Sequence, residues 1–61
     1  MDYVIYDIAN GILQWEGPAY DQIDAWKQFR SELGYDEDIP GVCERSKYLI
    51  ETRRDFDNAG R

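Results

Sequence analysis

The side chains that could do chemistry in this chain are mainly carboxylates, because 13 of its 61 residues are aspartate or glutamate and none is histidine. Without histidine the commonest general base is missing, and neither Ser31 nor Ser46 has a partner to activate it. Cys43 would need a depressed pKa to act as a nucleophile, and a small buried thiol is the simpler interpretation. The glycines stand singly at turns and form no phosphate-binding loop. We therefore expect no catalytic residue, no cofactor site and no enzymatic activity.

The densest acidic run, residues 36–38, raises the question of a metal site. Read as an EF-hand loop that starts at Asp36, it places Pro40 at position 5 and Lys47 at position 12, where calcium requires a bidentate glutamate. One cysteine and no histidine also rule out the usual structural zinc patterns. The sequence thus predicts an acidic loop and no metal site.

The distribution of charge indicates the kind of partner. The formal net charge is −6: residues 1–44 hold ten acidic and two basic residues, and residues 45–61 hold three acidic and five basic ones. An acidic excess of this size attracts basic surfaces and repels phosphates. The basic residues near the C-terminus, Arg45, Lys47, Arg53 and Arg54, are interpreted as balancing the acidic remainder within the fold or across a dimer. We therefore expect no direct binding to nucleic acid.

The clearest structural signal is a β-hairpin over 3–16, folded about Asn10-Gly11. Asn-Gly between two apolar runs favours a two-residue type I′ turn. Such a turn pairs Tyr6 with Trp15, and alternation then sorts the side chains onto two faces. The face expected to form the core holds Val4, Tyr6, Ile8, Leu13 and Trp15. The second face holds Tyr3, Ile5, Asp7, Ile12, Gln14 and Glu16.

A helix is predicted over 21–33, after Gly17-Pro18 ends the second strand. Asp21 is the expected N-cap, and Gly34 is the expected residue just past the C-terminus. Helical spacing places Ala25, Trp26, Phe29 and Leu33 in one stripe, which should pack on the core face of the hairpin. The opposite side of the helix carries an acidic and polar row made of Asp21, Asp24, Gln28 and Glu32.

The last part of the chain decides the fold class. A β-rich run within 47–54 predicts a third strand, although the same residues also fit a helix. We expect one α+β domain over 1–61, in the order ββαβ, with one amphipathic helix on one face of a small antiparallel sheet. The alternative is ββαα, in which a second helix covers the second face. Residues 55–61 are expected to form a flexible tail.

The candidate site is a partner-binding surface on the polar side of the helix and in the acidic loop beyond it. Residues three or four apart on one helix face rise about 4.5 to 6 Å, so the carboxylates form a line. Exposed aromatic rings beside such a line are suitable anchors. The predicted binding residues are Asp21, Asp24, Glu32, Asp36, Glu37 and Asp38, with Tyr20 and Tyr35 as the aromatic anchors.

A short, acidic, histidine-free chain of hairpin-plus-helix design, in which residues 15–18 (Trp-Glu-Gly-Pro) lead into 21–26 (Asp-Gln-Ile-Asp-Ala-Trp), resembles small inhibitor proteins of phages and mobile elements. These include anti-CRISPR and anti-restriction inhibitors, several of which imitate DNA. The resemblance implies stoichiometric inhibition, in which the acidic surface occupies the basic nucleic-acid-binding surface of a defence complex. The alternative is a small adaptor or homodimerising protein that works through Tyr3, Ile5 and Ile12.

The sequence also predicts where the protein acts. No apolar run approaches 18 residues, and no signal peptide is expected because Met1-Asp2 opens acidic and Asp7 interrupts the first strand. The single cysteine fits a reducing compartment. We expect a cytoplasmic protein with no membrane partner, in the host-cell cytoplasm if a phage encodes it.

Overall fold

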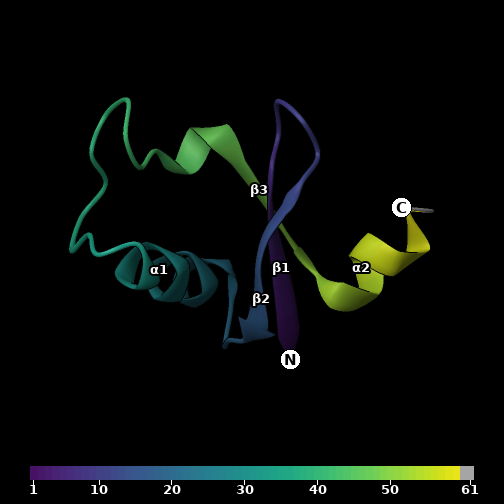
Figure 1. The fold of residues 1–61 in the computed structure, drawn as a ribbon. Coiled ribbons are helices and arrows are strands. Elements are labelled where there is room, and N and C mark those ends of the chain that lie inside the picture. The colour runs from purple at the N-terminus through teal and green to yellow at the C-terminus, as the bar shows by residue number, and fades with distance from the viewer. Residues whose placement is uncertain (60–61) are drawn as a thin grey trace.

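Three antiparallel strands form the centre of the fold in the computed structural model, which describes residues 1–59 (Figure 1). The strand order is β2-β1-β3, so the first strand is central and pairs with both others. This α+β architecture and the ββαβ order confirm the predicted fold class, and the third strand is formed in place of the alternative helix. The elements are β1 (Asp2–Asp7), β2 (Leu13–Pro18), α1 (Gln22–Glu32), the 3₁₀ helix η1 (Arg45–Lys47), β3 (Tyr48–Thr52) and α2 (Arg53–Asn58).

The two helices lie on opposite sides of the sheet, with α1 on one face and α2 on the other (Figure 1). The expectation of a flexible tail is wrong for residues 55–58, which belong to α2. Thr52 starts this helix as its N-cap, because its hydroxyl accepts a hydrogen bond from the Asp55 backbone N–H at 3.1 Å. The Phe56 ring then packs on Tyr6 of β1, with ring centroids 5.6 Å apart. Residues 60–61, the end of the expected tail, lie outside the described residues.

The hairpin loop differs from the expected two-residue turn. A type I′ turn needs positive φ at both central residues, but among residues 1–59 only glycines have positive φ. The Asp7 carboxylate accepts the Ala9 N–H at 2.8 Å, and the Asn10 side chain accepts the Ile12 N–H at 2.8 Å. These local bonds hold a four-residue loop, which closes where the Asp7 N–H donates to the Ile12 carbonyl at 3.0 Å.

A β-bulge then shifts the register by one residue within the hairpin. Tyr6 pairs with Leu13, whereas Ile5 pairs with Trp15, so Gln14 is the extra residue. The side chain of Trp15 therefore lies on the same face as that of Ile5. Because the side-chain period of a strand is 2, this single insertion changes which residues share a face.

The prediction of which hairpin face meets the helix was consequently wrong. α1 packs against Tyr3, Ile5 and Trp15, together with Tyr48 and Ile50 of β3, and not against the face of Val4, Tyr6, Ile8 and Leu13. Val4 and Tyr6 are nevertheless buried, because α2 lies on their side of the sheet. β1 is therefore covered on both faces, which explains why its run of apolar residues is continuous.

The core between α1 and the sheet consists of few, large side chains. Trp26, Phe29 and Tyr48 form a cluster in which the ring centroids lie 5.2 to 5.6 Å apart. Ile5, Ala25, Cys43 and Ile50 fill the rest of this core. Aromatic pairs at such distances add to the free energy gained from burying their area. This aromatic cluster fixes the orientation of α1, and with it the direction in which the polar side of α1 points.

Both predicted ends of α1 are confirmed. The Asp21 carboxylate accepts the Asp24 N–H at 2.8 Å as the N-cap. At the C-terminus Gly34 has φ +93° and donates to the Ser31 carbonyl at 3.0 Å, while Tyr35 donates to the Arg30 carbonyl at 3.1 Å. These two bonds make up a Schellman motif, which satisfies carbonyls that the helix leaves unpaired.

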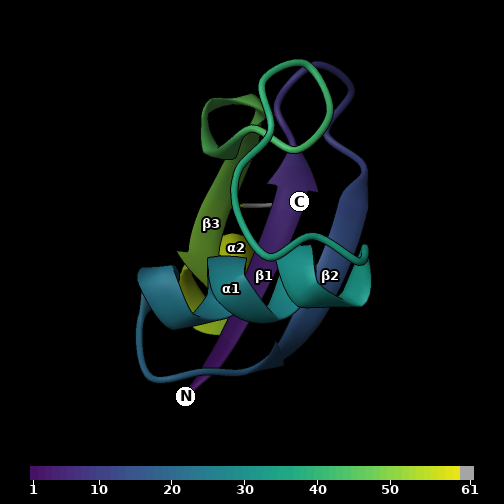
Figure 2. The same ribbon diagram turned by 90° about the vertical axis from the view of Figure 1, so that its left-hand side faces the viewer.

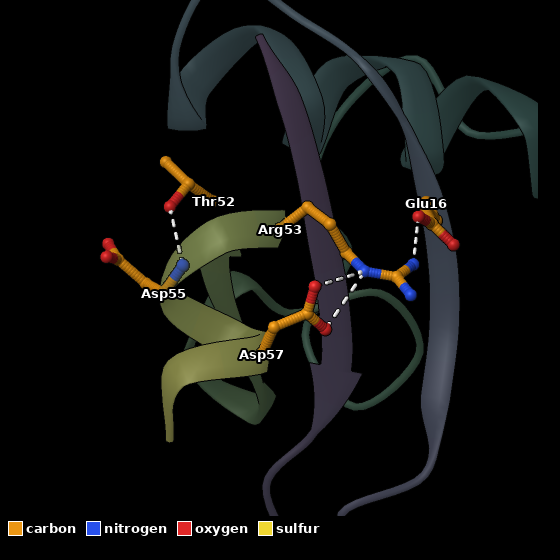
Figure 3. A network of polar contacts seen from close by, with 5 residues as sticks. All are labelled: Glu16, Thr52, Arg53, Asp55 and Asp57. Carbon is orange, nitrogen blue, oxygen red and sulfur yellow. Dashed lines mark hydrogen bonds and ion pairs between the residues drawn. The ribbon is translucent and has the colours of Figure 1, made fainter. Parts of the chain in front are cut away.

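A network of charged side chains ties α2 to the hairpin (Figure 3). Arg53 forms an ion pair with Glu16 of β2 and a second one with Asp57, at 3.2 Å, on the next turn of α2. The two carboxylates raise the pKa of the Arg53 guanidinium above its ordinary value, with Glu16 as the larger cause. This residue, one of the basic group near the C-terminus, thus balances acidic charge within the fold.

Candidate functional site

The N-terminal part of the candidate site is built by the first turns of α1. Asp24 Oδ2 accepts the Tyr20 N–H at 3.0 Å and a side-chain N–H of Gln28 at 3.1 Å. Gln28 also donates to the Pro18 carbonyl at 2.9 Å, which ties α1 to the end of β2. The carboxylates of Asp21 and Asp24 are therefore held in fixed positions, and the Tyr20 side chain beside them is 95 % exposed.

The C-terminal part of the row faces the edge of the sheet. Glu32 accepts a hydrogen bond from the indole N–H of Trp15 on β2. Trp15 lies across Gly17, where a Cβ atom would come within 2.9 Å of the Trp15 ring. A groove of about 510 Å³ runs between β2 and α1, and Lys27 and Ser31 contribute to its helical wall. Gln28 and Glu32 thus lie on the flank of α1 beside β2, rather than on the side directly away from the sheet as the sequence suggested. Asp21, at the start of α1, instead lines a hollow with Ile50 and Thr52 of β3.

Asp38, in the loop after α1, has a structural role. It accepts the indole N–H of Trp26 at 2.7 Å and forms an ion pair with Arg30 at 2.8 Å. The hydrogen bond from Trp26 lowers the pKa of Asp38 most, and the bond from Arg30 lowers it further. Asp38 therefore anchors the long connection between α1 and β3 to the helix, and Arg30 offsets its charge.

The other loop residues separate into two groups. Asp36 and Glu37 are exposed, and their side chains have no hydrogen bond or ion pair within residues 1–59. Tyr35 is half-buried and packs against the core, which places its ring away from the rim where an anchor was expected. We use the name α1 acidic surface for the remaining five carboxylates of the site, which are Asp21, Asp24, Glu32, Asp36 and Glu37.

The cations of residues 1–59 form no ion pair with most of this surface, although Lys27 lines the same groove as Glu32. Arg30 faces Asp38, and Arg53 faces Glu16 and Asp57. Arg45 donates to the Tyr48 carbonyl at 2.8 Å. Within the described residues, the α1 acidic surface forms no ion pair with a lysine or arginine. Its carboxylates are held by hydrogen bonds or exposed, and their charges remain available to an outside cation.

Two features of the site could not be read from hydrophobic periodicity. Trp15 positions the carboxylate of Glu32, and this contact depends on how β2 lies beside α1, whereas the bond from Gln28 to Asp24 joins residues four apart within α1. The α2 side of the sheet also carries exposed aliphatic side chains. Leu13 and Leu49 both pair with Tyr6, so they flank it on one face, and they are 42 % and 39 % exposed. We name these two leucines the aliphatic patch.

Cys43 is fully buried, and burial is the main cause that raises the pKa of its thiol. Across residues 1–59, no three carboxylate or thiol groups gather as metal ligands would. The same residues contain no helix with the length and apolar character needed to cross a bilayer.

The comparisons with known proteins do not assign the chain to a family. No protein-family model, no curated protein and no solved structure matches it. The function is therefore inferred from the site itself.

Proposed function

We propose that this protein is a non-catalytic inhibitor that binds a basic, nucleic-acid-binding surface of a protein partner through its α1 acidic surface. This is the mode of action of the anti-CRISPR and anti-restriction proteins of the DNA-mimic type that the sequence resembles. The site of action would be the cytoplasm, and neither a cofactor nor a metal takes part.

The observation that supports the proposal is a fixed line of carboxylates that form no ion pair within residues 1–59. Asp21, Asp24 and Glu32 span about 16 Å along the axis of α1. Each accepts a hydrogen bond from another group of the fold, so its position is set before any partner arrives. A preorganised charge array loses less conformational entropy on binding than mobile side chains do. Such an array also steers a basic partner from a distance, in a manner that salt weakens.

The structure allows these three charges to be removed without removing their hydrogen bonds. Asp21→Ser keeps a good N-cap. Asp24→Asn and Glu32→Gln keep the acceptor oxygens for Tyr20 and Trp15. A matched control removes three carboxylate charges elsewhere by Asp2→Asn, Asp7→Asn and Glu44→Gln. Both triple variants carry the same formal net charge, so a difference between them reports position and not total charge.

The test is competition with duplex DNA. The immobilised protein captures candidates from a bacterial lysate at low salt, and each purified candidate that binds DNA is then challenged with this protein. We expect the wild type and the control triple variant to displace DNA, and the triple variant of Asp21, Asp24 and Glu32 to fail. Displacement by that variant as effective as by the wild type would contradict the proposal, as would an affinity that is insensitive to salt.

A second candidate function is association through an apolar surface, as an adaptor or a homodimer. The aliphatic patch favours it, because Leu13 and Leu49 flank Tyr6 on the α2 side of the sheet and remain 42 % and 39 % exposed. The residues first expected for this role do not form one surface: Ile5 is fully buried beneath α1, and Tyr3 is half-buried there, whereas Ile12 is exposed.

The role of the aliphatic patch can be tested by measuring the oligomeric state of the protein. If the patch joins two copies, sedimentation velocity should show a dimer that Leu49→Lys converts to a monomer, with little effect of salt because the contact is apolar. A monomer at every concentration tested would exclude the homodimer.

A further inference from the structure

We propose that the tip of the hairpin loop is a modification site, at which Asn10 deamidates by reaction with the backbone nitrogen of Gly11. The inference goes beyond the proposed function and does not depend on it. The loop, residues 8–11, stands at the end of the sheet opposite the N-terminus (Figures 1 and 2). Asn10 and Gly11 are both exposed, so water and bases from the solvent reach them.

The reaction joins neighbouring groups of the chain and consumes only water. The Gly11 nitrogen loses its proton to a base from the solvent and attacks the Asn10 Cγ atom, and the side-chain amide nitrogen leaves as ammonia. The new bond closes a five-membered succinimide ring. Water then opens the ring at either of its two carbonyl carbons, which yields aspartate or isoaspartate. The balance is one water consumed and one ammonia released, with no oxidation or reduction.

Gly11 offers little steric hindrance to this attack. A Cβ atom on the residue that follows an asparagine lies close to the attacking nitrogen, and glycine has none. Gly11 has φ +71°, and a Cβ atom added to it would meet nothing within 4 Å. The surroundings of Gly11 are therefore open on that side.

The Asn10 side chain is already turned toward the nitrogen that attacks it. Its Oδ1 atom accepts the Ile12 N–H at 2.8 Å, which bends the side chain back along the backbone of Gly11 in an Asx turn. The amide carbon is thereby held beside the Gly11 peptide. The same N–H of Ile12 is positioned to stabilise the negative charge that develops on Oδ1 during the attack.

One hydrogen bond of the loop opposes the reaction. The Gly11 N–H donates to the Asp7 carbonyl at 2.8 Å, and this bond has to open before the proton can leave. An exposed loop opens at a low cost in free energy, because a single hydrogen bond contributes only modestly to stability. We therefore expect the fold to slow the reaction by no more than about tenfold relative to a short peptide of residues 8–13.

Asn58, the second asparagine of the chain, is a matched internal control. It is exposed at the end of α2, and the N–H of the next residue, Ala59, donates to the Asp55 carbonyl at 3.1 Å. Both asparagines are thus exposed and followed by a hydrogen-bonded N–H, but Ala59 carries a Cβ atom. Asn58 should therefore stay unchanged over the time in which Asn10 converts.

The two products have different consequences for the hairpin. Aspartate keeps an oxygen that accepts the Ile12 N–H, and it adds one negative charge to the formal −6. Isoaspartate adds one carbon to the main chain of the loop that closes between Asp7 and Ile12, because the Cγ carbonyl becomes part of the backbone. In NMR spectra, isoaspartate should shift the amide signals of Ala9, Gly11 and Ile12 and leave those of α1 in place.

Peptide mapping by mass spectrometry tests the site. Trypsin separates the two asparagines, because Lys27 and Arg54 lie between them. After incubation of the folded protein in mildly alkaline buffer, the peptide with Asn10 should gain one dalton and become a substrate of an isoaspartate methyltransferase. The peptide with Asn58 should gain no mass. Gly11→Ala should suppress the gain at Asn10, and circular dichroism checks that this variant is folded.

Equal conversion of Asn10 and Asn58 would overturn the inference, and so would conversion of folded Gly11→Ala at the rate of the wild type. The comparison with a synthetic peptide of residues 8–13 decides the matter without any variant. Conversion of the peptide more than about tenfold faster than that of the folded protein would show that the fold protects Asn10, and the inference would then fail. None of these results bears on the proposed inhibition, which competition with DNA tests separately.

Discussion

Replacing Ile5 by alanine is the substitution that tests the unexpected face of the sheet most sharply. Ile5 is fully buried in the central strand, where it packs between Ile50 of β3 and the aromatic residues of α1. Truncating a side chain in such a position removes its transfer free energy and leaves a cavity, which together cost about 3 kcal/mol within a range of 2 to 5. The comparison variant is Ile12→Ala, because Ile12 was expected on the same face as Ile5 but is 57 % exposed.

The size of the effect follows from the small size of the chain. A domain of 61 residues has a free energy of unfolding of about 3 to 9 kcal/mol, so Ile5→Ala should remove a third of it or more. The melting temperature should fall by more than about 10 °C, since 1 kcal/mol corresponds to about 4 to 8 °C for a domain of this size. Ile12→Ala should change the free energy of unfolding by no more than about 0.5 kcal/mol.

Urea denaturation followed by tryptophan fluorescence measures both variants, because Trp26 is buried in the affected core. The prediction is refuted if both substitutions change the free energy of unfolding by no more than about 0.5 kcal/mol. That result would leave Ile5 as well as Ile12 outside the core and would place α1 on the opposite face, that of Val4, Tyr6, Ile8 and Leu13, as the two-residue turn predicted.

Three further predictions concern the ends of α1 and the loop after it. Asp21→Ala should lower the free energy of unfolding by about 1 kcal/mol and Asp21→Ser by a few tenths, because serine keeps the N-cap bond; equal losses in urea melts would argue against the capping role. Gly34→Ala should cost about 1 to 2 kcal/mol, since the added Cβ meets nothing within 4 Å and only the positive φ opposes it; a neutral result in the same assay would contradict this. Because the pKa of Asp38 is lowered in the folded state, its ionised carboxylate stabilises the fold at pH values above the ordinary carboxyl pKa. This stabilisation is lost as the pH falls through the folded-state pKa. The gap in urea midpoint between wild type and Asp38→Asn should therefore narrow below about pH 4, and a gap that stays constant down to pH 3 would exclude this linkage.

The elements that the sequence predicted well are those with local signals. Asp21 and Gly34 bracket α1 because capping depends on residues within one turn. β3 follows from a short run of β-branched and aromatic residues that a neighbouring strand could pair with. α2 had a local signal too, since Thr52 followed by Asp55 fits the spacing of an N-cap and its first turn, but the polar composition of the segment suggested a tail.

The faces of the hairpin could not be predicted because two local interactions competed with the Asn-Gly turn. The side chains of Asp7 and Asn10 bond to nearby backbone N–H groups and lengthen the loop to four residues. The bulge at Gln14 then moves Trp15 to the side of Ile5. Hydrophobic periodicity does not reveal a one-residue insertion. The insertion nevertheless changes the face of the sheet on which the side chains beyond it lie.

The candidate site was predictable in its residue types but less so in its geometry. Spacing alone placed Asp21, Asp24 and Glu32 along one side of a helix. The pairing of Asp38 with Trp26 and Arg30 depends on how the loop after α1 returns to the helix. The composition of the loop alone does not distinguish Asp38, which makes these contacts, from its exposed neighbours Asp36 and Glu37.

The measurement that tests the central claim most directly is competition with duplex DNA for a captured basic partner, using the two triple variants. The account predicts that Asp21→Ser, Asp24→Asn and Glu32→Gln together abolish displacement of DNA, while Asp2→Asn, Asp7→Asn and Glu44→Gln together leave it intact. Equal displacement by both variants would contradict it, because binding would then depend on total charge or on another surface and not on the α1 acidic surface.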